Sequence, residues 1–364
     1  MLGVSFVRLG GGEADVVLPS AEHDAFERYL ERLEASAIFP ASAFVALKQA
    51  SARRVDLPAA PRIGIPVAEP SALMADEDIE RLVALVKEMR CTPVLIPPCA
   101  SVVCAQADRR AAVAAIVATL HGILGPGGDD VDPRIYKETR RPETAATNYP
   151  RDRFEADVAL AGRAGNVFMF GICRSHQLWN AAFGGTLVQD MRGEGRSAVS
   201  QDQGAFSMPL DRPFVVYWPD GRIRFENRVR VTPKTQLAAI VQCESFLTNS
   251  WHHQAVDTVG LGMRVCGAVR DPETQTETIE ATEDWNVMTT QFHPECMQRD
   301  LVQKRLLAVL GRRAHVLALA SQLREPSLRA LTDGMRTLSA SAFSDADWEW
   351  AERELGARLA PVPA

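Results

Sequence analysis

An α/β domain, with a mostly parallel sheet covered by helices on both faces, is predicted for residues 61–310 of this 364-residue chain. Two observations lead to that fold class. Short apolar runs typical of buried strands alternate with segments whose apolar residues recur at helical spacing. One of these runs opens into consecutive glycines, and another passes directly into a helical pattern, as happens at the carboxyl ends of parallel strands. With 46% hydrophobic residues, the chain can bury one large core and still carry additions.

Expected strands and helices alternate along this region. Apolar runs predict strands, and apolar residues at helical spacing or alanine-rich stretches predict helices. The expected order is a strand at 62–65, a helix near 79–86 behind an acidic start, a strand at 93–97, a helix near 107–120, a strand at 122–124, a helix at 152–164 and a strand at 167–170. Between 195 and 250 the pattern changes to prolines, a turn at 219–221 and alternating polarity, which favours antiparallel strands or long loops.

Two flanks lie outside this core. Residues 1–60 form an N-terminal extension of unassigned role, with a strand-like opening and a helix capped by Ser20. Residues 311–364 form a helical C-terminal extension, in which Ser344 and Asp347 have the spacing of a capping box. Either flank is a candidate for joining protomers, binding a protein partner or covering the active site.

The composition excludes several classes of protein. A formal net charge of −6 leaves no basic surplus to neutralise phosphates, so no nucleic-acid partner is expected. No uncharged apolar stretch reaches the roughly 20 residues that a membrane span needs. The N-terminus lacks the basic-then-apolar pattern of a secretory signal. We therefore expect a cytoplasmic protein with no membrane partner.

One of the seven cysteines, Cys173, lies where a nucleophile is expected. No pair of cysteines has the C-x-x-C spacing of a zinc or redox site. Cys173 follows the apolar run 168–170 and begins a helical pattern, so it would stand on a sharp turn at the carboxyl end of the sheet. The first N–H groups of that helix favour a thiolate, and the N–H of Arg174 can bind an oxyanion. The alternative is a buried core cysteine at a strand end.

A candidate general base follows another strand-like run, at 287–290. His293 is separated from Glu295 by one proline, which holds the two in a rigid turn. The carboxylate can accept a hydrogen bond from one ring nitrogen and stabilise the imidazolium. Taken alone, this tripeptide is more often a surface turn. It indicates a general base only in combination with the Cys173 turn.

The glycine-rich stretch 122–133 is the third candidate. Consecutive glycines let the backbone approach a ligand and free N–H groups for an oxyanion. The stretch lacks the Gly-Lys-Ser/Thr ending of a Walker loop and fits the dinucleotide fingerprint poorly. An ordinary turn at a strand end is the alternative.

A fourth stretch, 248–256, contains adjacent histidines. A shared metal ion is disfavoured, because neighbouring residues on a strand point to opposite faces. A single histidine that faces the substrate is the preferred interpretation, with a structural histidine as the alternative.

Together these stretches resemble the glutamine amidotransferase-like superfamily, and within it the gamma-glutamyl hydrolases, including the bacterial gamma-glutamyl-gamma-aminobutyrate hydrolase type. The resemblance rests on Gly-Gly-x-Asp-Val-Asp-Pro, Gly-Ile-Cys-Arg-x-His-Gln, Gly-Gly-Thr-Leu-x-Gln-Asp, Asn-Ser-x-His-His-Gln-Ala-Val and His-Pro-Glu, in that order, within residues 61–310. It implies a flavodoxin-like three-layer fold.

The resemblance also implies a Cys-His-Glu triad that hydrolyses a γ-glutamyl amide through a thioester, without cofactor or metal. Its residues would be the nucleophile Cys173, the base His293 and its partner Glu295; the oxyanion N–H groups of Gly127, Gly128 and Arg174; and the substrate contacts Gln177 and His252. A glutaminase that delivers ammonia to a synthetase partner is the first alternative. A divergent non-catalytic member is the second, because Ser175 stands where the family usually has glycine.

Overall fold

The computed structural model describes residues 4–8, 15–19, 60–67, 77–98, 106–165, 167–191, 216–217, 223–224, 227–270, 275–297 and 300–322. The helix expected after Ser20, the turn at 219–221 and the capping box at Ser344 lie outside these residues. Within the described part, no helix is both long enough and apolar enough to cross a membrane.

Five parallel strands form the centre of the sheet. They are β3 (Arg62–Pro66), β4 (Thr92–Ile96), β5 (Gly122–Gly125), β6 (Phe168–Ile172) and β15 (Val287–Thr290), and they lie in the spatial order β4-β3-β5-β6-β15. Every neighbouring pair in this row is parallel. Strands β5 and β6 are buried along their whole length, as their uninterrupted apolar sequences require.

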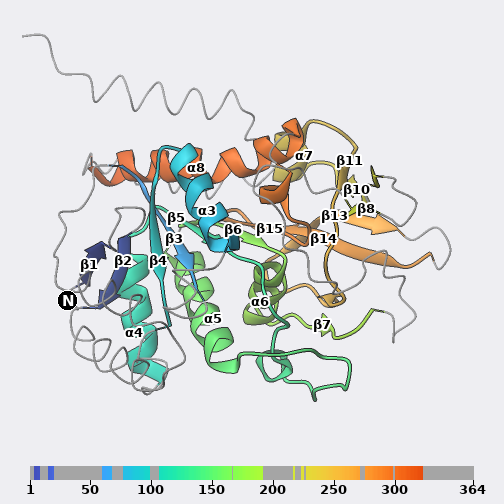
Figure 1. Cartoon of the computed structure of the whole chain (residues 1–364), viewed down its shortest axis with the longest axis horizontal. Coiled ribbons are helices and arrows are strands. Elements are labelled where there is room, and N and C mark those ends of the chain that lie inside the picture. The colour runs from blue at the N-terminus through green and yellow to red at the C-terminus, as the bar shows by residue number, and fades with distance from the viewer. Residues whose placement is uncertain are drawn as a thin grey trace, which may run out of the picture.

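Helices cover both faces of these strands. Figure 1 shows α8 (Leu301–Gln322) and α3 (Glu77–Glu88) along one side and α4 (Gln106–Val117), α5 (Tyr149–Ala164) and α6 (Arg174–Ala182) along the other. The helical spacing predicted for α3 is confirmed, since its apolar residues Ile79, Leu82, Val83 and Val86 are all buried. The predicted fold class, an α/β domain with a mostly parallel sheet and helices on both faces, is confirmed.

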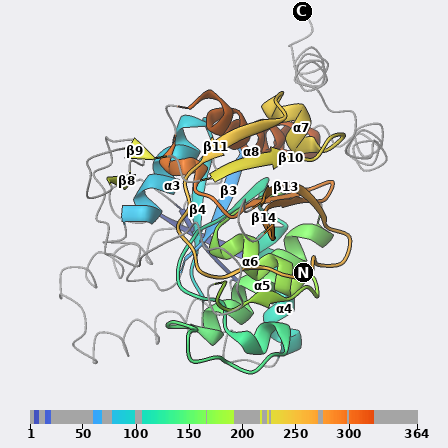
Figure 2. The ribbon, with the colours of Figure 1, turned by 90° about the vertical axis from the view of Figure 1, so that its right-hand side faces the viewer.

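Beyond β15 the same sheet continues with antiparallel strands. These are β14 (Glu277–Glu283), β13 (Arg264–Arg270), β10 (Asn227–Val231) and β11 (Ser245–Thr248), with the two-residue strands β7 (Leu187–Val188) and β12 (Ala255–Val256) alongside. Strands β8 (Val216–Tyr217) and β9 (Ile223–Arg224) form a separate antiparallel pair. Figure 2 shows this half of the molecule from its own side. The antiparallel character expected for 195–250 holds for the described strands, but the short helix α7 (Gln236–Val241), capped by Thr235, was not predicted.

Parts of both flanks join the core. Strand β2 (Asp15–Pro19) pairs in parallel with β4, and β1 (Val4–Arg8) pairs antiparallel with β2, so the strand-like opening of the N-terminal extension adds two strands to the sheet edge. At the other end, the boundary expected at residue 310 falls inside α8, which packs against β5 and β6. Both Leu310 and Ala314 are fully buried there, because the apolar face of α8 continues past the boundary.

Candidate active site

Cys173 lies between β6 and α6, at the carboxyl end of the sheet. Its backbone has φ 48° and ψ −101°, a positive φ that a residue with a side chain rarely adopts. The Cys173 N–H donates to the carbonyl of Thr290 at 2.7 Å, which ties this turn to the end of β15. The side chain is largely buried. The sharp strand-to-helix turn predicted for a nucleophile is therefore present.

His293 lies at the same edge of the sheet. Strands β6 and β15 are parallel neighbours, and Ile172 is paired with Thr290, so their carboxyl ends coincide. Gly127 bridges the two side chains: a Cβ built on it would lie 3.1 Å from His293 Cε1 and 3.8 Å from Cys173 Cβ. The expectation that Cys173 and His293 share one edge is confirmed.

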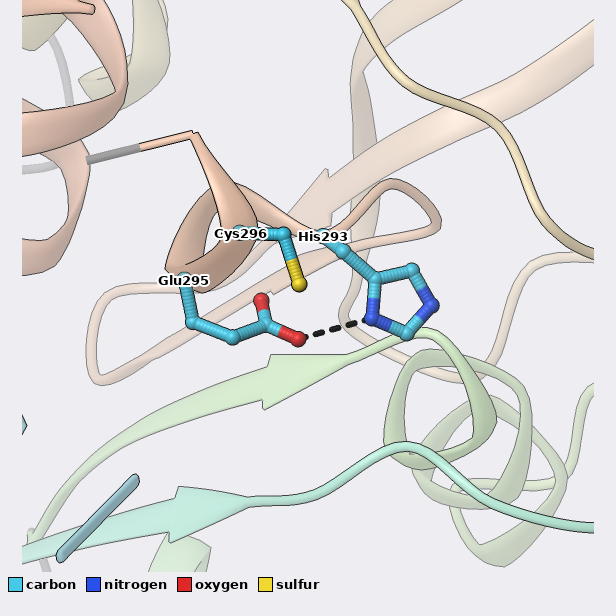
Figure 3. A group of neighbouring side chains, drawn as sticks. All are labelled: His293, Glu295 and Cys296. Atoms are coloured by element: carbon cyan, nitrogen blue, oxygen red, sulfur yellow. Dashed lines mark hydrogen bonds and ion pairs between the residues drawn. The ribbon is translucent and has the colours of Figure 1, made fainter. Parts of the chain in front are cut away.

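Glu295 orients the imidazole of His293. The turn η5 (Pro294–Cys296) brings the carboxylate Oε1 to 2.7 Å from His293 Nδ1, as Figure 3 shows. Asn249 holds the same histidine by its backbone: its Oδ1 accepts from His293 N–H at 2.8 Å, and its Nδ2 donates to His293 O at 2.9 Å. The Trp251 ring lies beside the imidazole, with 6.1 Å between the centroids. Glu295 therefore holds one nitrogen of the imidazole, Asn249 holds the backbone of His293, and Trp251 lies along one side of the ring.

The electrostatic surroundings favour a protonated His293. Burial opposes the charged imidazolium, but the negative charges of Glu295 and Cys173 outweigh it, and the pKa of His293 is raised well above its usual value of 6.5. Because Nδ1 is occupied by Glu295, the second proton is carried on Nε2. The site therefore favours a charged imidazolium beside the Cys173 sulfur.

The glycine turn after β5 supplies backbone donors. Gly128 has φ +144°, a conformation that side-chain-bearing residues rarely adopt, so glycine is required there. Across the turn, Arg174 is the first residue of α6, and its N–H has no carbonyl one turn earlier in the helix to bind. Gly127 and Arg174 thus lie beside Cys173, and Gly128 follows in the same turn.

Ser175 supports the glycine turn from beneath. Its hydroxyl donates to the carbonyl of Pro126 at 2.7 Å, and its side chain is fully buried. A Cβ built on Gly125 would come within 2.6 Å of Ser175 Cβ, so strand end and helix start are in close contact. The serine that departs from the family pattern is accommodated by a hydrogen bond within this contact.

Within the described residues, one cluster has the composition of a metal site. Ligand atoms of His293, Glu295 and Cys296 all lie within 4.8 Å of one another, and Figure 3 draws all three. Two of these atoms already bind each other in the His293–Glu295 hydrogen bond. The Arg81 guanidinium also donates to Cys296 Sγ at 3.5 Å, which places a positive charge beside the cluster. This arrangement serves the histidine rather than a cation.

Side-chain amides line the other side of the thiol. Gln291 Nε2 lies 3.6 Å from Cys173 Sγ, and its Oε1 accepts from Gln177 Nε2 at 3.1 Å. Gln177 also donates to the carbonyl of Gln254 at 3.0 Å. Gln177, a predicted substrate contact, is thus linked to the thiol through Gln291. All three amide side chains are buried.

The adjacent histidines have different surroundings. His252 Nδ1 lies 2.7 Å from the carbonyl of Gln254 and its Nε2 lies 3.8 Å from Glu280, deep in the antiparallel half. Burial lowers the pKa of His252 to about 4 and raises that of Glu280 to about 8. His253 instead bonds to Asp130 at 2.9 Å, and its pKa is raised mainly by that hydrogen bond. The two rings bind different partners, as argued against a shared metal ion.

A buried ion-pair network lies on the opposite side of Cys173. The guanidinium of Arg174 pairs with Asp152 and, at 2.5 Å, with Glu155. Glu155 also accepts from Arg151 Nε at 2.6 Å, and Asp152 accepts from the N–H of Asp132 at 2.9 Å. The network joins the starts of α5 and α6 to the glycine turn.

Several residues of the site were not identified from the sequence. Asn249 stood inside a quoted motif and Gln291 just before another, but their contacts with His293 and Cys173 join segments far apart in the chain. The charged residues of the ion-pair network lie at the start of a helix, a pattern that by itself is typical of a solvated surface. They are Arg151, Asp152 and Glu155.

Comparison with known proteins identifies the family to which this sequence is similar. The model of the family described as Peptidase C26 matches residues 65–295, which contain the glycine turn, Cys173 and the His293–Glu295 pair. Protein NtpR of Enterococcus hirae is 29% identical over 170 residues, which are 46% of this chain and 64% of NtpR. YvdE of Lactococcus lactis, named as glutamine amidotransferase-like, is 30% identical over 174 residues, 48% of this chain and 65% of YvdE. The chain thus spans just under two thirds of the length of these two relatives.

Two solved structures are also similar to this chain. The glutaminase domain of CTPS from Trypanosoma brucei, with bound acivicin, gives a TM-score of 0.45 at 12% identity and covers 70% of this chain and 94% of that one. A glutamine amidotransferase from Thermotoga maritima gives a TM-score of 0.39 at 10% identity and covers 83% of this chain and 99% of that one. The family match, which extends over more than half of the sequence, is consistent with cysteine-dependent amide hydrolysis. The chain belongs to the Peptidase C26 family of glutamine amidotransferase-like proteins.

Proposed function

We propose that this protein hydrolyses a γ-glutamyl amide bond through a thioester on Cys173 and releases glutamate and an amine. The observation that carries the proposal is the convergence at one sheet edge of a cysteine on a strained turn and a histidine whose Nδ1 is bound by a carboxylate. A cysteine hydrolase needs this pairing of nucleophile and oriented base.

The first half of the reaction acylates the enzyme. The thiolate of Cys173 attacks the γ-carbonyl carbon, and the carbonyl oxygen becomes an oxyanion that accepts from the N–H groups of Gly128 and Arg174. His293 then gives its Nε2 proton to the departing nitrogen, the C–N bond breaks, and a neutral amine leaves. A raised pKa suits His293 to this step, because the proton is already in place at neutral pH.

The second half hydrolyses the thioester. His293, now neutral, removes a proton from water as the water oxygen attacks the acyl carbon, and the same N–H groups bind the second oxyanion. The C–S bond breaks, glutamate leaves, and the thiolate and imidazolium are restored. Glu295 remains ionised throughout and keeps the ring in place.

The same residues would serve a glutaminase that passes ammonia to a synthetase. YvdE, whose name includes glutamine amidotransferase-like, favours keeping this second candidate. The two are separated by substrate: a free-standing hydrolase turns over γ-glutamyl amides of larger amines, whereas a glutaminase prefers glutamine and is stimulated by its partner.

Replacement of the nucleophile is the first test. Cys173→Ala should lower glutamate release from a panel of γ-glutamyl amides and glutamine by at least about a thousandfold, because covalent catalysis is lost. Mass spectrometry of released glutamate measures the effect, and thermal unfolding checks that the variant is folded. Cys243→Ala, which removes a half-buried cysteine outside the site, is the matched control and should keep wild-type activity. Full activity in Cys173→Ala would end the cysteine-hydrolase proposal.

A further inference from the structure

Arg151 is a buried cation whose terminal donors are not used within the described part of the chain. Only 7% of the residue is exposed, and its Nε donates to Glu155. Among the residues that the structure describes, Nη1 and Nη2 have no hydrogen-bond partner, and Asp129, which follows the glycine turn, forms no ion pair with them. Neither terminal nitrogen is fully enclosed by the described residues, so the N–H groups along this edge are accessible to a ligand that enters from solvent.

The unpaired edge of the guanidinium is directed at the glycine turn. A Cβ built on Gly128 would lie 3.1 Å from Nη1 and 3.5 Å from Nη2 of Arg151. Because Gly128 has no side chain, its Cα leaves this edge uncovered. On its other face the turn meets Cys173 and His293, through Gly127. The guanidinium therefore stands one residue away from the point where the scissile carbonyl would bind.

The neighbouring carboxylates contact Arg151 only at Nε. Asp152 and Glu155 each give one contact to Arg174, Glu155 gives its other oxygen to Arg151 Nε, and Asp152 gives its other oxygen to the N–H of Asp132. The Nη1–Nη2 edge of a guanidinium binds the two oxygens of a carboxylate with parallel hydrogen bonds. Arg151 also lies in the first turn of α5, where the helix dipole favours negative charge.

We propose that Arg151 is a specificity-determining residue that binds a carboxylate of the substrate beside the glycine turn. The inference rests on the proposed hydrolysis of a γ-glutamyl amide. Two carboxylates can fill this role: the α-carboxylate of the glutamyl half, or one carried by the amine half. Both present the same planar anion, and the substrate panel distinguishes them.

The test uses three matched substrates and the full-length protein. One is a γ-glutamyl amide of an uncharged amine, the second is the same compound with its α-carboxylate converted to a carboxamide, and the third carries a carboxylate on the amine. For the compound whose carboxylate binds Arg151, Arg151→Gln should lower kcat/KM by about 10–100-fold, as expected for loss of a charge-assisted pair. The compound that lacks that carboxylate should change by less than about threefold. Arg151→Lys should recover part of the loss.

Arg153→Gln is the matched control, since it removes a half-buried arginine from the same helix turn and should leave the substrate preference unchanged. A structural role for Arg151 would slow all three substrates equally, and that outcome would overturn the inference. Preferential loss on the α-carboxylate compounds assigns the glutamyl half, and loss only on the third assigns the amine half.

A binding measurement separates this inference from the proposed function. Glutamate and the third substrate are each titrated calorimetrically into Cys173→Ala, and at least one of them should bind at least about tenfold more weakly when Arg151→Gln is added. If wild type hydrolyses no γ-glutamyl amide but this binding difference is found, the proposed reaction fails and Arg151 still binds a carboxylate. Equal binding of both ligands with and without Arg151 would refute the inference whatever the activity.

Discussion

The two sides of Cys173 use opposite kinds of polar chemistry. On the side of α5 and α6, charged groups are buried in pairs: Arg174 with Asp152 and Glu155. On the side of the antiparallel strands, the buried groups that continue from the thiol are neutral near pH 7: the Gln291 and Gln177 amides, a His252 whose pKa is lowered by burial and a Glu280 whose pKa is raised by burial. The named groups on both sides are buried, so the two sides differ in whether their polar groups form ion pairs or hydrogen bonds between neutral groups.

This difference between the two sides fits the charges that the proposed reaction would place near Cys173, an oxyanion at the glycine turn and an imidazolium at His293. Buried ion pairs are rigid, since their geometry must offset the desolvation of both charges. They stand behind the turn that would bind the oxyanion, where fixed donors are needed. Neutral amides on the other side can contact a neutral part of the substrate without adding a charge near the His293 imidazolium. The charged side therefore holds the backbone, and the neutral side contacts the thiol.

Loss of the central cation on the charged side should have the largest effect on stability. Arg174→Met keeps the backbone N–H of residue 174 but leaves Asp152 and Glu155 without their main cation. We expect the free energy of unfolding to fall by about 3–5 kcal/mol, because uncompensated buried charges remain. Urea unfolding monitored by circular dichroism measures it, with the half-buried Arg153, changed to Met, as the matched control on α5. A loss below about 1 kcal/mol would mean that the network is solvated and that the two sides do not differ as described.

The neutral side predicts a pH-dependent effect at Glu280. Burial gives Glu280 a folded-state pKa of about 8, above its usual value of 4.5, so the folded state holds this proton more tightly than the unfolded state. The resulting stability is fully present below pH 4.5 and is lost as the pH rises toward 8. Glu280→Gln removes the titration, so the variant should gain stability relative to wild type as the pH rises from about 5 to about 9. The gain should approach about 1–3 kcal/mol, since each tenfold difference in proton affinity corresponds to roughly 1.4 kcal/mol and relaxation of the fold reduces the total.

Thermal or urea unfolding of both proteins at about pH 5, 7 and 9 checks this prediction. The sign is the diagnostic feature: a Glu280→Gln variant that loses stability relative to wild type as the pH rises would show that Glu280 is ionised in the fold. Glu277→Gln, which changes an exposed acid at the start of the same strand, is the control, because the surface ion pair of Glu277 with Arg230 contributes at most about 1 kcal/mol.

The contrast between the two sides also separates what could be predicted from the sequence from what could not. Parallel strands and the Cys173 turn were predictable, because buried strands are continuous apolar runs and their carboxyl ends share one edge. His293 could be assigned for the same reason. The ion pairs of Arg174 could not, since α5 resembles an ordinary charged helix until its packing against α6 is known. Likewise, the neutral state of Glu280 follows from burial alone, and its strand, Glu277–Glu283, alternates like an exposed strand.

The adjacent histidines test whether the neutral side is functional. His252 belongs to the neutral network, whereas His253 is held by Asp130. His252→Ala should raise KM or lower kcat by about tenfold or more, and His253→Ala should have a clearly smaller effect. Steady-state kinetics on one γ-glutamyl amide measures both, with unfolding curves to compare their stability. Equal, small effects at the two positions would make the pair structural.

The smallest expected effect is at Ser175, where the two sides meet beneath the glycine turn. The serine hydroxyl donates to Pro126 O, a net contribution of about 1 kcal/mol, and its side chain packs against Gly125. Ser175→Gly removes both contacts and costs about 0.5 kcal/mol more in helix propensity, so stability should fall by about 1–2 kcal/mol. The N–H groups of Gly128 and Arg174 belong to the main chain, so the substitution does not remove them. Consequently kcat/KM should stay within about tenfold, equivalent to roughly 1.4 kcal/mol of transition-state binding.

Ser175→Ala keeps the methylene and loses only the hydroxyl, so it separates the packing from the hydrogen bond, and its stability should fall between those of wild type and Ser175→Gly. Steady-state kinetics and urea unfolding of the three proteins measure both effects. If wild type is nearly inert and glycine restores turnover by much more than about tenfold, Ser175 is a disabling change and the protein is a divergent, non-catalytic member of its family. We expect the modest effect, because the hydroxyl fits the Pro126 carbonyl and the Cys173, His293 and Glu295 arrangement is intact above it.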